Sequence, residues 1–252
     1  MSGHSKWSKI KRKKGANDAK RGKIFSRIIK EITVAAKEGG SGDPAFNPRL
    51  RLAIANAKGA NMPKENVERA IKKGLDKDAA SFMEPTYEGY APGGIAVFVE
   101  CTTDNLQRTV AHVRAIFNKK GGNLATNGSV DFLFERKGIF VIDKGDRELE
   151  DLELELIDSG AEDLDHDEET GEVTITVDFS DFGNMQKKLE DMGIEAKSAN
   201  LERIPTTTTT LPVSESKSVL HLIESLEEDE DVQAVYHNLE MTEELAMALD
   251  ED

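Results

Sequence analysis

The segment from residue 138 to residue 204 most constrains the fold. Its apolar residues switch between the two-residue repeat of a strand and the three- or four-residue repeat of a helix. In "VTITVDF", Val173, Ile175 and Val177 alternate with polar residues, which predicts a strand with one buried face. The acidic "DEETGE" that leads into it is typical of a hairpin turn rather than a crossover. The full series is a strand at 138–143, a helix marked by Leu149, Leu152 and Leu156, strands at 161–165 and 172–179, a helix from Phe182 to Met192, and a strand at 195–204. This β-α-β-β-α-β order is that of the split βαβ, or ferredoxin-like, fold.

The residues on either side of this segment repeat the same order. The expected elements are a strand at 94–101, a helix at 104–120 and a strand at 129–135, then a strand at 206–212, a helix at 215–228 and a strand at 231–237. The "TTTTT" run suits a strand because threonine is β-branched. We therefore expect one ferredoxin-like domain inserted into the central connection of another.

The first 80 residues predict a small helical domain. Apolar residues recur every three or four positions from Phe25 to Ala36, and again after Asn47 and Pro63, which predicts three helices between residues 18 and 76. Residues 77–94 are expected to be a linker. The predicted α+β chain thus has a basic arm and three-helix domain at 1–80, a split α+β domain at 81–136 and 205–240, an inserted ferredoxin-like domain at 137–204 and an acidic tail at 241–252.

Charge is divided unevenly along the chain. Residues 1–80 hold 20 Lys and Arg against 8 Asp and Glu, a net charge of +12, whereas residues 81–252 hold 13 against 40, a net charge of −27. Such asymmetry indicates contact with nucleic acid or an anionic membrane at the basic end. The membrane alternative is weaker, since the basic arm lacks an apolar face.

The basic arm "HSKWSKIKRKKG" and the start of the first helix hold the best candidates for a binding site. Their cations could neutralise phosphates, and the indole could stack on a base. These nucleic-acid-binding candidates are Lys6, Trp7, Lys9, Lys11, Arg12, Lys13, Lys14, Lys20, Arg21, Lys23 and Arg27. The alternative is a solvated terminus that binds nothing specific. The loop "YEGYAPGG" is a second candidate contact through Tyr87, Tyr90, Gly93 and Gly94, although it could simply be a turn into a strand.

No pattern in the sequence indicates catalysis, a metal or a cofactor. "GGSGD" lacks the G-K-[ST] ending of a phosphate-binding loop, and "DHDEETGE" does not match the spacing of a calcium loop. The five histidines show no metal-ligand spacing, and the single cysteine, Cys101, indicates a reducing compartment. We therefore expect a non-enzymatic cytoplasmic protein without cofactor or membrane segment.

Several longer strings together resemble one known family. They are "GHSKWSKIKRKKGANDAKRGKIFSRIIKEITVAA", "NPRLRLAIANAKGANMPKENVERAIKKG", "YEGYAPGGIAVFVECTTDN", "GSVDFLFERKG" and "DVQAVYHN". The chain is similar, over most of its length, to the YebC/PmpR family. The resemblance implies a helical N-terminal domain and two α+β domains, one inserted in the other.

The resemblance also implies a function. It suggests a cytoplasmic bacterial protein that acts as a probable transcriptional regulator and binds DNA through its basic N-terminal domain. The family is also related to mitochondrial translational activators of cytochrome c oxidase, so a ribosome-associated translation factor that contacts ribosomal RNA is the alternative. A metal-dependent nuclease is a weaker alternative. The sequence leaves open the choice between DNA and RNA, the target sequence, the oligomeric state and the role of the acidic domains.

Overall fold

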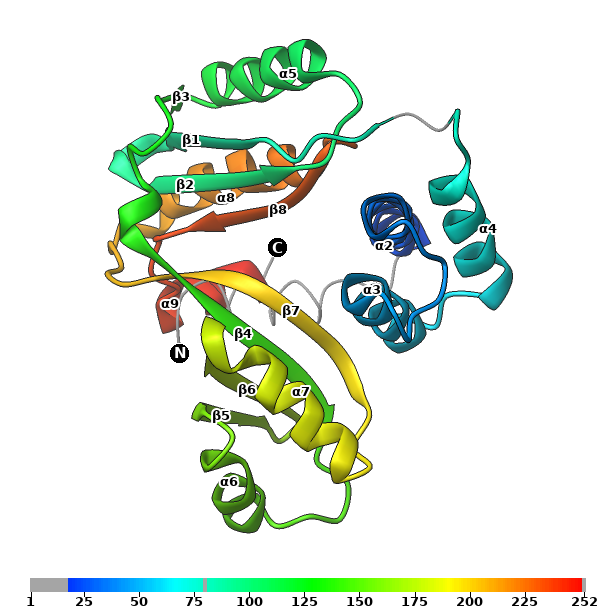
Figure 1. Cartoon of the computed structure of the whole chain (residues 1–252). Coiled ribbons are helices and arrows are strands. Elements are labelled where there is room, and N and C mark those ends of the chain that lie inside the picture. The colour runs from blue at the N-terminus through cyan, green and yellow to red at the C-terminus, as the bar shows by residue number, and fades with distance from the viewer. Residues whose placement is uncertain (1–17, 79–80, 251–252) are drawn as a thin grey trace. The chain divides into compact units, whose positions relative to one another are not determined.

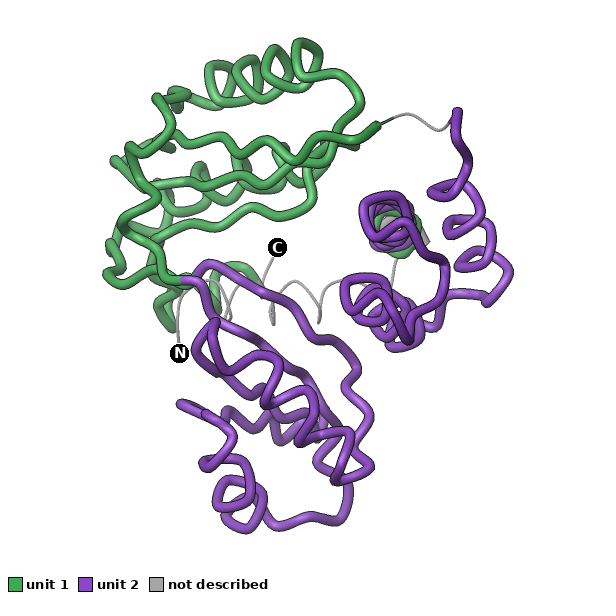
Figure 2. Tube along the Cα trace, in the orientation of Figure 1, with its two compact units in different colours: residues 1–23, 80–135, 204–252 green, residues 24–79, 136–203 purple. Residues whose placement is uncertain are grey.

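The computed structural model describes residues 18–78 and 81–250, and the chain divides into two compact units (Figure 2). Unit 1 comprises residues 1–23, 80–135 and 204–252. Unit 2 comprises residues 24–79 and 136–203. Each unit is therefore built from segments that lie far apart in the sequence.

The predicted N-terminal helices are α2 (Asp18–Gly39), α3 (Pro48–Gly59) and α4 (Lys64–Leu75) (Figure 1). Asn47 caps α3: its side-chain oxygen accepts a hydrogen bond from the Leu50 amide at 3.0 Å, and its side-chain nitrogen donates to the Ala35 carbonyl at 2.7 Å. The cap thus also ties α3 to α2. A shared core lies among the helices, formed by Ile32, Ala35, Leu50, Ala53, Ala57, Met62 and Ala70.

The second part of unit 2 has the predicted ferredoxin-like order. Its elements are β4 (Phe134–Asp143), α6 (Leu149–Ile157), β5 (Ala161–Asp167), β6 (Glu172–Asp178), α7 (Phe182–Asp191) and β7 (Ala196–Pro205). The strands lie in the order β5-β6-β4-β7, and β6 runs antiparallel to both β4 and β5. Leu152, Leu156, Met185 and Leu189 of the two helices share one core with alternate residues of β4 and β6. The alternation seen in the sequence therefore marks the buried face.

Unit 1 contains a second four-stranded sheet in the order β3-β1-β2-β8. Its elements are β1 (Thr86–Tyr90), β2 (Ala96–Cys101), α5 (Leu106–Lys119), β3 (Asn123–Leu124), α8 (Val213–Glu227) and β8 (Val232–His237). β1 is antiparallel to β2 and β3, and β2 is antiparallel to β8. Val113 and Phe117 of α5 and Ile223 and Leu226 of α8 pack in one core with the sheet. This strand order corresponds position by position to the order β5-β6-β4-β7 of the inserted sheet. β1 takes the position that β6 has there.

The predicted strand at 206–212 is wrong. Within this stretch Thr209 forms only an isolated bridge with Leu239. The sheet position that this strand would take is filled by β1, from the region predicted to be a linker. Gly89 interrupts the strand pattern of β1, yet a Cβ there would meet the Phe117 ring at 2.7 Å. Glycine is thus required by close packing rather than by a loop.

The predicted strand at 129–135 is wrong for residues 129–133, and only its last two residues belong to a strand. Residues Asp131–Leu133 form a 3₁₀ turn, and β4 begins only at Phe134 and continues without a break through residues 138–143. Glu88 holds the preceding loop, because its buried carboxylate accepts hydrogen bonds from the amides of Gly128, Val130 and Asp131 at 2.6, 2.6 and 3.0 Å. These local bonds replace the ladder of a strand.

The segment expected as an acidic tail contains a further helix, α9 (Glu243–Asp250). Leu245 of α9 is buried in the core of unit 1, next to Met241. The C-terminal acidic residues are therefore carried in part by a packed helix.

Candidate nucleic-acid interface

The structure describes only some of the residues of the predicted basic site. Lys6, Trp7, Lys9, Lys11, Arg12, Lys13 and Lys14 lie outside the described residues, and Lys20 lies in the first turn of α2. Among the remaining candidates, Arg21 and Lys23 are exposed and Arg27 is half-buried on the same helix. The described cations of the predicted site therefore come from the first half of α2.

Some other basic residues of the helical part are bound to protein carboxylates. Arg49 forms ion pairs with Glu31 at 2.8 Å and Glu38 at 2.6 Å, which join α3 to α2. Lys58 pairs with Glu195 of the inserted domain. Because these contacts already satisfy the two cations, their charges contribute less to attracting phosphate than the sequence suggests.

Other cations of the helical part stay available to a ligand. Arg51, Lys72 and Lys73 are exposed, and none of them forms an ion pair within the described ranges. Lys72 and Lys73 occupy the last turn of α4, where the helix dipole favours positive charge. The first turns of α4 instead carry Glu65 and Glu68. The exposed face of α4 is thus mixed in charge at its start, where Lys64 pairs with Glu68, and basic at its end.

Tyr87 and Tyr90, the two tyrosines of the second candidate contact, lie on opposite faces of β1. Tyr87 packs against the main core of unit 1. Burial, together with the negative charges of Cys101 and Asp231, raises the pKa of the Tyr87 hydroxyl. Tyr90 instead donates a hydrogen bond to the Ser129 carbonyl at 3.1 Å and packs against a second, smaller cluster. The two rings do not form one surface.

Gly93 and Gly94 form the exposed tip of the turn after β1. Their φ angles are +73° and +76°, a region that favours glycine. The Ala91 amide donates to the Ile95 carbonyl at 2.8 Å and closes the turn. The structure thus explains the glycines by backbone geometry, and a role of this tip in binding stays a prediction.

Asp231 organises a polar cluster in unit 1 that the sequence did not single out. Its carboxylate is 5% exposed and accepts hydrogen bonds from the Thr109 hydroxyl at 2.9 Å and from the Arg108 guanidinium at 2.8 Å. The hydrogen bond to Asp231 is the main cause of the raised pKa of Arg108. Thr103 also donates to Asp231, at 3.2 Å. The cluster therefore fixes the start of α5 to the residue that precedes β8.

A docking contact within unit 2 was also missed. The side chain of Asn56 in α3 donates to the Ala199 carbonyl at 3.0 Å and accepts from the Ala199 amide at 2.9 Å, as a neighbouring strand would. Gly59 allows the helix to approach the Lys197 carbonyl. The string "NAKG", which places the asparagine and the glycine three residues apart, is the signal that could have predicted this contact.

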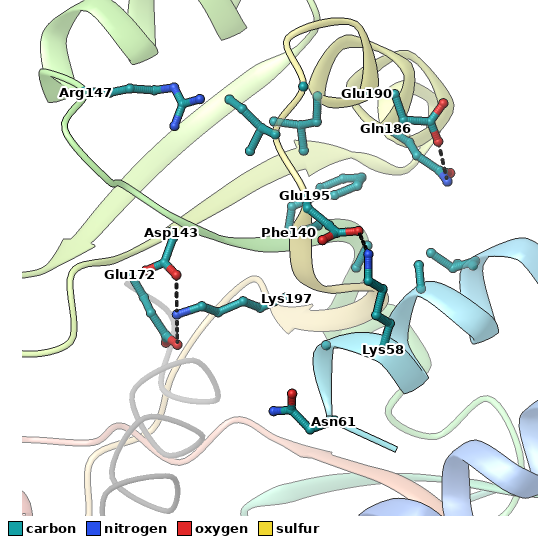
Figure 3. A pocket seen from close by; sticks show the side chains of 18 residues that line it. Lys58, Asn61, Phe140, Asp143, Arg147, Glu172, Gln186, Glu190, Glu195 and Lys197 are labelled. Atoms are coloured by element: carbon teal, nitrogen blue, oxygen red, sulfur yellow. Dashed lines mark hydrogen bonds and ion pairs between the residues drawn. The ribbon is translucent and has the colours of Figure 1, made fainter. Parts of the chain in front are cut away.

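A cavity of about 1210 Å³ lies beside this contact in unit 2 (Figure 3). Lys197 is one of the residues that line the cavity. Its ammonium group forms ion pairs with Asp143 at 3.0 Å and Glu172 at 3.2 Å. Burial alone would lower the pKa of Lys197, but the hydrogen bonds to the two carboxylates outweigh it and the pKa is raised. Since Lys58 is also paired, the labelled lysines serve the protein's own carboxylates rather than an incoming anion.

Among residues 18–78 and 81–250, no group of three or more histidines, cysteines or carboxylates is placed to hold a metal ion. In the same residues, no helix combines the length and the apolar character that a membrane crossing requires.

Two family models match consecutive parts of the chain. The model described as the TACO1/YebC protein N-terminal domain matches residues 5–77, and the one described as the TACO1/YebC second and third domain matches residues 82–239. The matched ranges together span both the helical part and the two sheets.

Named relatives and a solved structure show the same likeness. A "Probable transcriptional regulatory protein" of Amoebophilus asiaticus is 54% identical over 95% of this chain and 98% of its own. A protein of the same name from Geobacillus thermodenitrificans is 52% identical over 95% and 97%. The crystal structure of the conserved hypothetical protein Aq1575 from Aquifex aeolicus is 44% identical and superposes with a TM-score of 0.80, covering 90% of this chain and 93% of that one.

Proposed function

Because the chain belongs to the TACO1/YebC family, whose relatives are named probable transcriptional regulatory proteins, we propose that it regulates gene expression by binding nucleic acid through its basic N-terminal part. DNA is the leading target. The protein acts by binding rather than by catalysis, and no cofactor takes part.

The segregation of charge is the observation that carries this proposal. A net charge of +12 in residues 1–80 attracts phosphate, whereas a net charge of −27 in residues 81–252 repels it. Exposed cations such as Lys23, Lys72 and Lys73 extend the basic character of the arm onto the helices. Nucleic acid is therefore steered to one end of the chain.

The salt dependence of binding tests the mechanism. If the site neutralises 6–10 phosphates, the affinity for a duplex should fall by roughly 10³–10⁵ between about 50 and 200 mM salt. Replacing Lys11, Arg12, Lys13 and Lys14 by glutamine should reduce that slope. The matched control replaces Arg114 and Lys119, two exposed cations of α5, and should leave the slope unchanged. A flat salt dependence of the unmodified chain contradicts the mechanism.

RNA is the second candidate target, and the described helices favour it. The first turn of α4 mixes Lys64 with Glu65, and in the first turn of α3 Arg49 is held by carboxylates of α2. Neither helix thus offers the uniformly polar and basic start with which a recognition helix enters the major groove. A basic arm that follows phosphates without reading base pairs suits structured RNA as well as duplex DNA. Competition between a duplex and ribosomal RNA at equal salt separates the two targets.

A further inference from the structure

Phe46 is the most exposed large apolar side chain of the described residues, at 81% exposure. It lies in the loop between α2 and α3, directly before Asn47, the N-cap of α3. An apolar side chain at this position commonly packs on the fourth residue of the helix, as a hydrophobic staple. That fourth residue is here Arg51, which is itself exposed, and Phe46 is not part of the core of the helices. The ring therefore does not serve to pack the start of α3.

The loop holds Phe46 in a defined position. The Asp43 side chain accepts a hydrogen bond from the Ala45 amide at 2.9 Å, and the Asp43 carbonyl accepts one from the Phe46 amide at 3.1 Å. The next residue, Asn47, is 4% exposed and donates to the Ala35 carbonyl at 2.7 Å. An exposed ring on such a positioned backbone loses little conformational entropy when a ligand covers it.

Exposed cations belong to the two helices that adjoin this loop. Arg51 lies near the start of α3. A Cβ atom on Gly42 would lie 2.9 Å from the Leu75 side chain, so the loop packs on the last turn of α4. That turn carries the exposed cations Lys72 and Lys73. The surface around the loop thus combines an aromatic ring with positive charge.

The carboxylates of this region are engaged within the fold. Glu38 pairs with Arg49 at 2.6 Å. Asp43 and Asp76 each accept a hydrogen bond from the amide two residues further along the chain, at 2.9 and 3.1 Å. The three exposed cations of the preceding paragraph form no ion pair within residues 18–78 and 81–250, so they remain available to a phosphate.

An aromatic ring and exposed cations together match single-stranded nucleic acid. The ring stacks on the face of a base, and the cations pair with the phosphates of the strand. The bases of a duplex are covered by their neighbours, whereas those of a single strand or loop can be splayed out onto a side chain. We propose that Phe46 stacks on an unpaired base of the bound nucleic acid and that Arg51 contacts a phosphate of the same strand. This inference rests on the proposed function and names the part of the nucleic acid that the helical part recognises.

Binding of labelled oligo(dT) and oligo(U), which do not pair with themselves, tests the stacking. Phe46→Ala in the full chain should weaken the affinity for these single strands by roughly 5- to 150-fold. Phe46→Leu should lose nearly as much, because leucine keeps apolar surface but has no π-face, and Phe46→Trp should retain the affinity. The matched control is Phe132→Ala, since Phe132 is 72% exposed but belongs to unit 1. It should leave the affinity unchanged.

Salt separates the two proposed contacts. Stacking releases no counterion, so Phe46→Ala should lower the affinity by the same factor at every salt concentration. Arg51→Gln removes one phosphate contact and should reduce the slope of log affinity against log salt by about 0.7. Lys119→Gln, at an exposed position of α5, is the control and should leave the slope unchanged. An unchanged slope in Arg51→Gln rules out the phosphate contact.

The outcomes distinguish this inference from the proposed function. If Phe46→Ala or Phe46→Leu binds both strands as tightly as the unmodified chain, stacking is overturned, while a steep salt dependence still supports the proposed function. An equal loss on a duplex also overturns it, since a duplex offers no unpaired base. Failure of the unmodified chain to bind any probe at low salt contradicts the proposed function itself. A loss confined to oligo(dT) or to oligo(U) assigns the stacking site to DNA or to RNA. Equal urea midpoints of the variants show that the fold is retained.

Discussion

The backbone of Gly59 in α3 lies directly against the carbonyl oxygen of Lys197 in β7. A Cβ atom at position 59 would overlap that oxygen, and a backbone carbonyl cannot move aside as the end of a side chain can. The helical part and the inserted domain of unit 2 therefore meet at a position that only glycine can occupy without a shift of the helix.

Replacing Gly59 by alanine should weaken this contact. Forcing an extra methyl group into a packed site typically costs about 1–3 kcal/mol. We expect a lower urea midpoint for unit 2 and faster hydrogen exchange of the β7 amides. Gly183 in α7 is the matched control, because a Cβ there meets nothing within 4 Å. Gly183→Ala should leave the midpoint unchanged or slightly raised, and an equal response of the two variants would contradict the packing argument.

Asn56 offers a second test of the same contact. The variant Asn56→Ala leaves both backbone groups of Ala199 without their side-chain partner, and loss of such bonds costs about 1–3 kcal/mol. Asn56→Asp should be worse, because a carboxylate cannot donate to the Ala199 carbonyl. The free energy of unfolding of each variant, measured in urea, gives the order. Equal values for alanine and aspartate would show that the donated bond is unimportant.

The buried carboxylate of Glu88 should be needed to order the loop before β4. In Glu88→Gln one oxygen is replaced by an NH₂ group, so either the Gly128 amide or the amides of Val130 and Asp131 lose their acceptor. A buried donor left facing another donor costs about 1–3 kcal/mol. Hydrogen exchange of residues 127–133 should therefore accelerate more than exchange in α8. Unchanged protection of this loop would rule out the anchoring role.

Tyr87 should make stability depend on pH in the alkaline range. Its folded pKa lies above the model-compound value of 10.0, because burial first and then the charges of Cys101 and Asp231 disfavour the phenolate. The unfolded chain releases the proton first, so stability that is present below pH 10 is lost as pH rises through the folded pKa. The unmodified chain should lose stability above pH 10 more steeply than Tyr87→Phe. An absorbance titration should show one late tyrosinate that the variant lacks.

The inserted domain was predictable because the spacing of its apolar residues in the sequence matches their burial in the structure. Val173, Ile175 and Val177 alternate regularly, and all three are fully buried. The two wrongly predicted strands, at 129–135 and 206–212, lie where alternation or strand propensity occurs without pairing in a sheet. Val130, Phe132 and Phe134 also alternate, yet Phe132 is 72% exposed and lies in a 3₁₀ turn that precedes β4. The threonine run has high strand propensity but no free sheet position, since β1 already pairs with β2 and β3.

The sequence predicted which end of the chain is basic, but not which of its charged residues are paired. Counting charges identified the basic end of the chain, but pairing depends on residues distant in sequence. Lys58 meets Glu195, and Arg108 meets Asp231, across more than a hundred positions. Tyr87 and Tyr90 looked like one loop surface, whereas the two-residue period of a strand sends them to opposite faces. Such relationships exist only once the sheets are assembled.

The order of strands in unit 1 also determines when each sheet can be completed during synthesis. The inserted sheet has all its strands once residue 205 has left the translating machinery. The sheet of unit 1 has three strands by residue 124 but must wait for β8, which ends at residue 237. Domains generally fold as units as they emerge, so the inserted domain should mature first. β4 and β7, the strands that enter and leave this domain, lie side by side in its sheet, and the Thr206 amide donates to the Leu133 carbonyl at 2.9 Å, so the two ends of the insertion are already tied together when β8 is made.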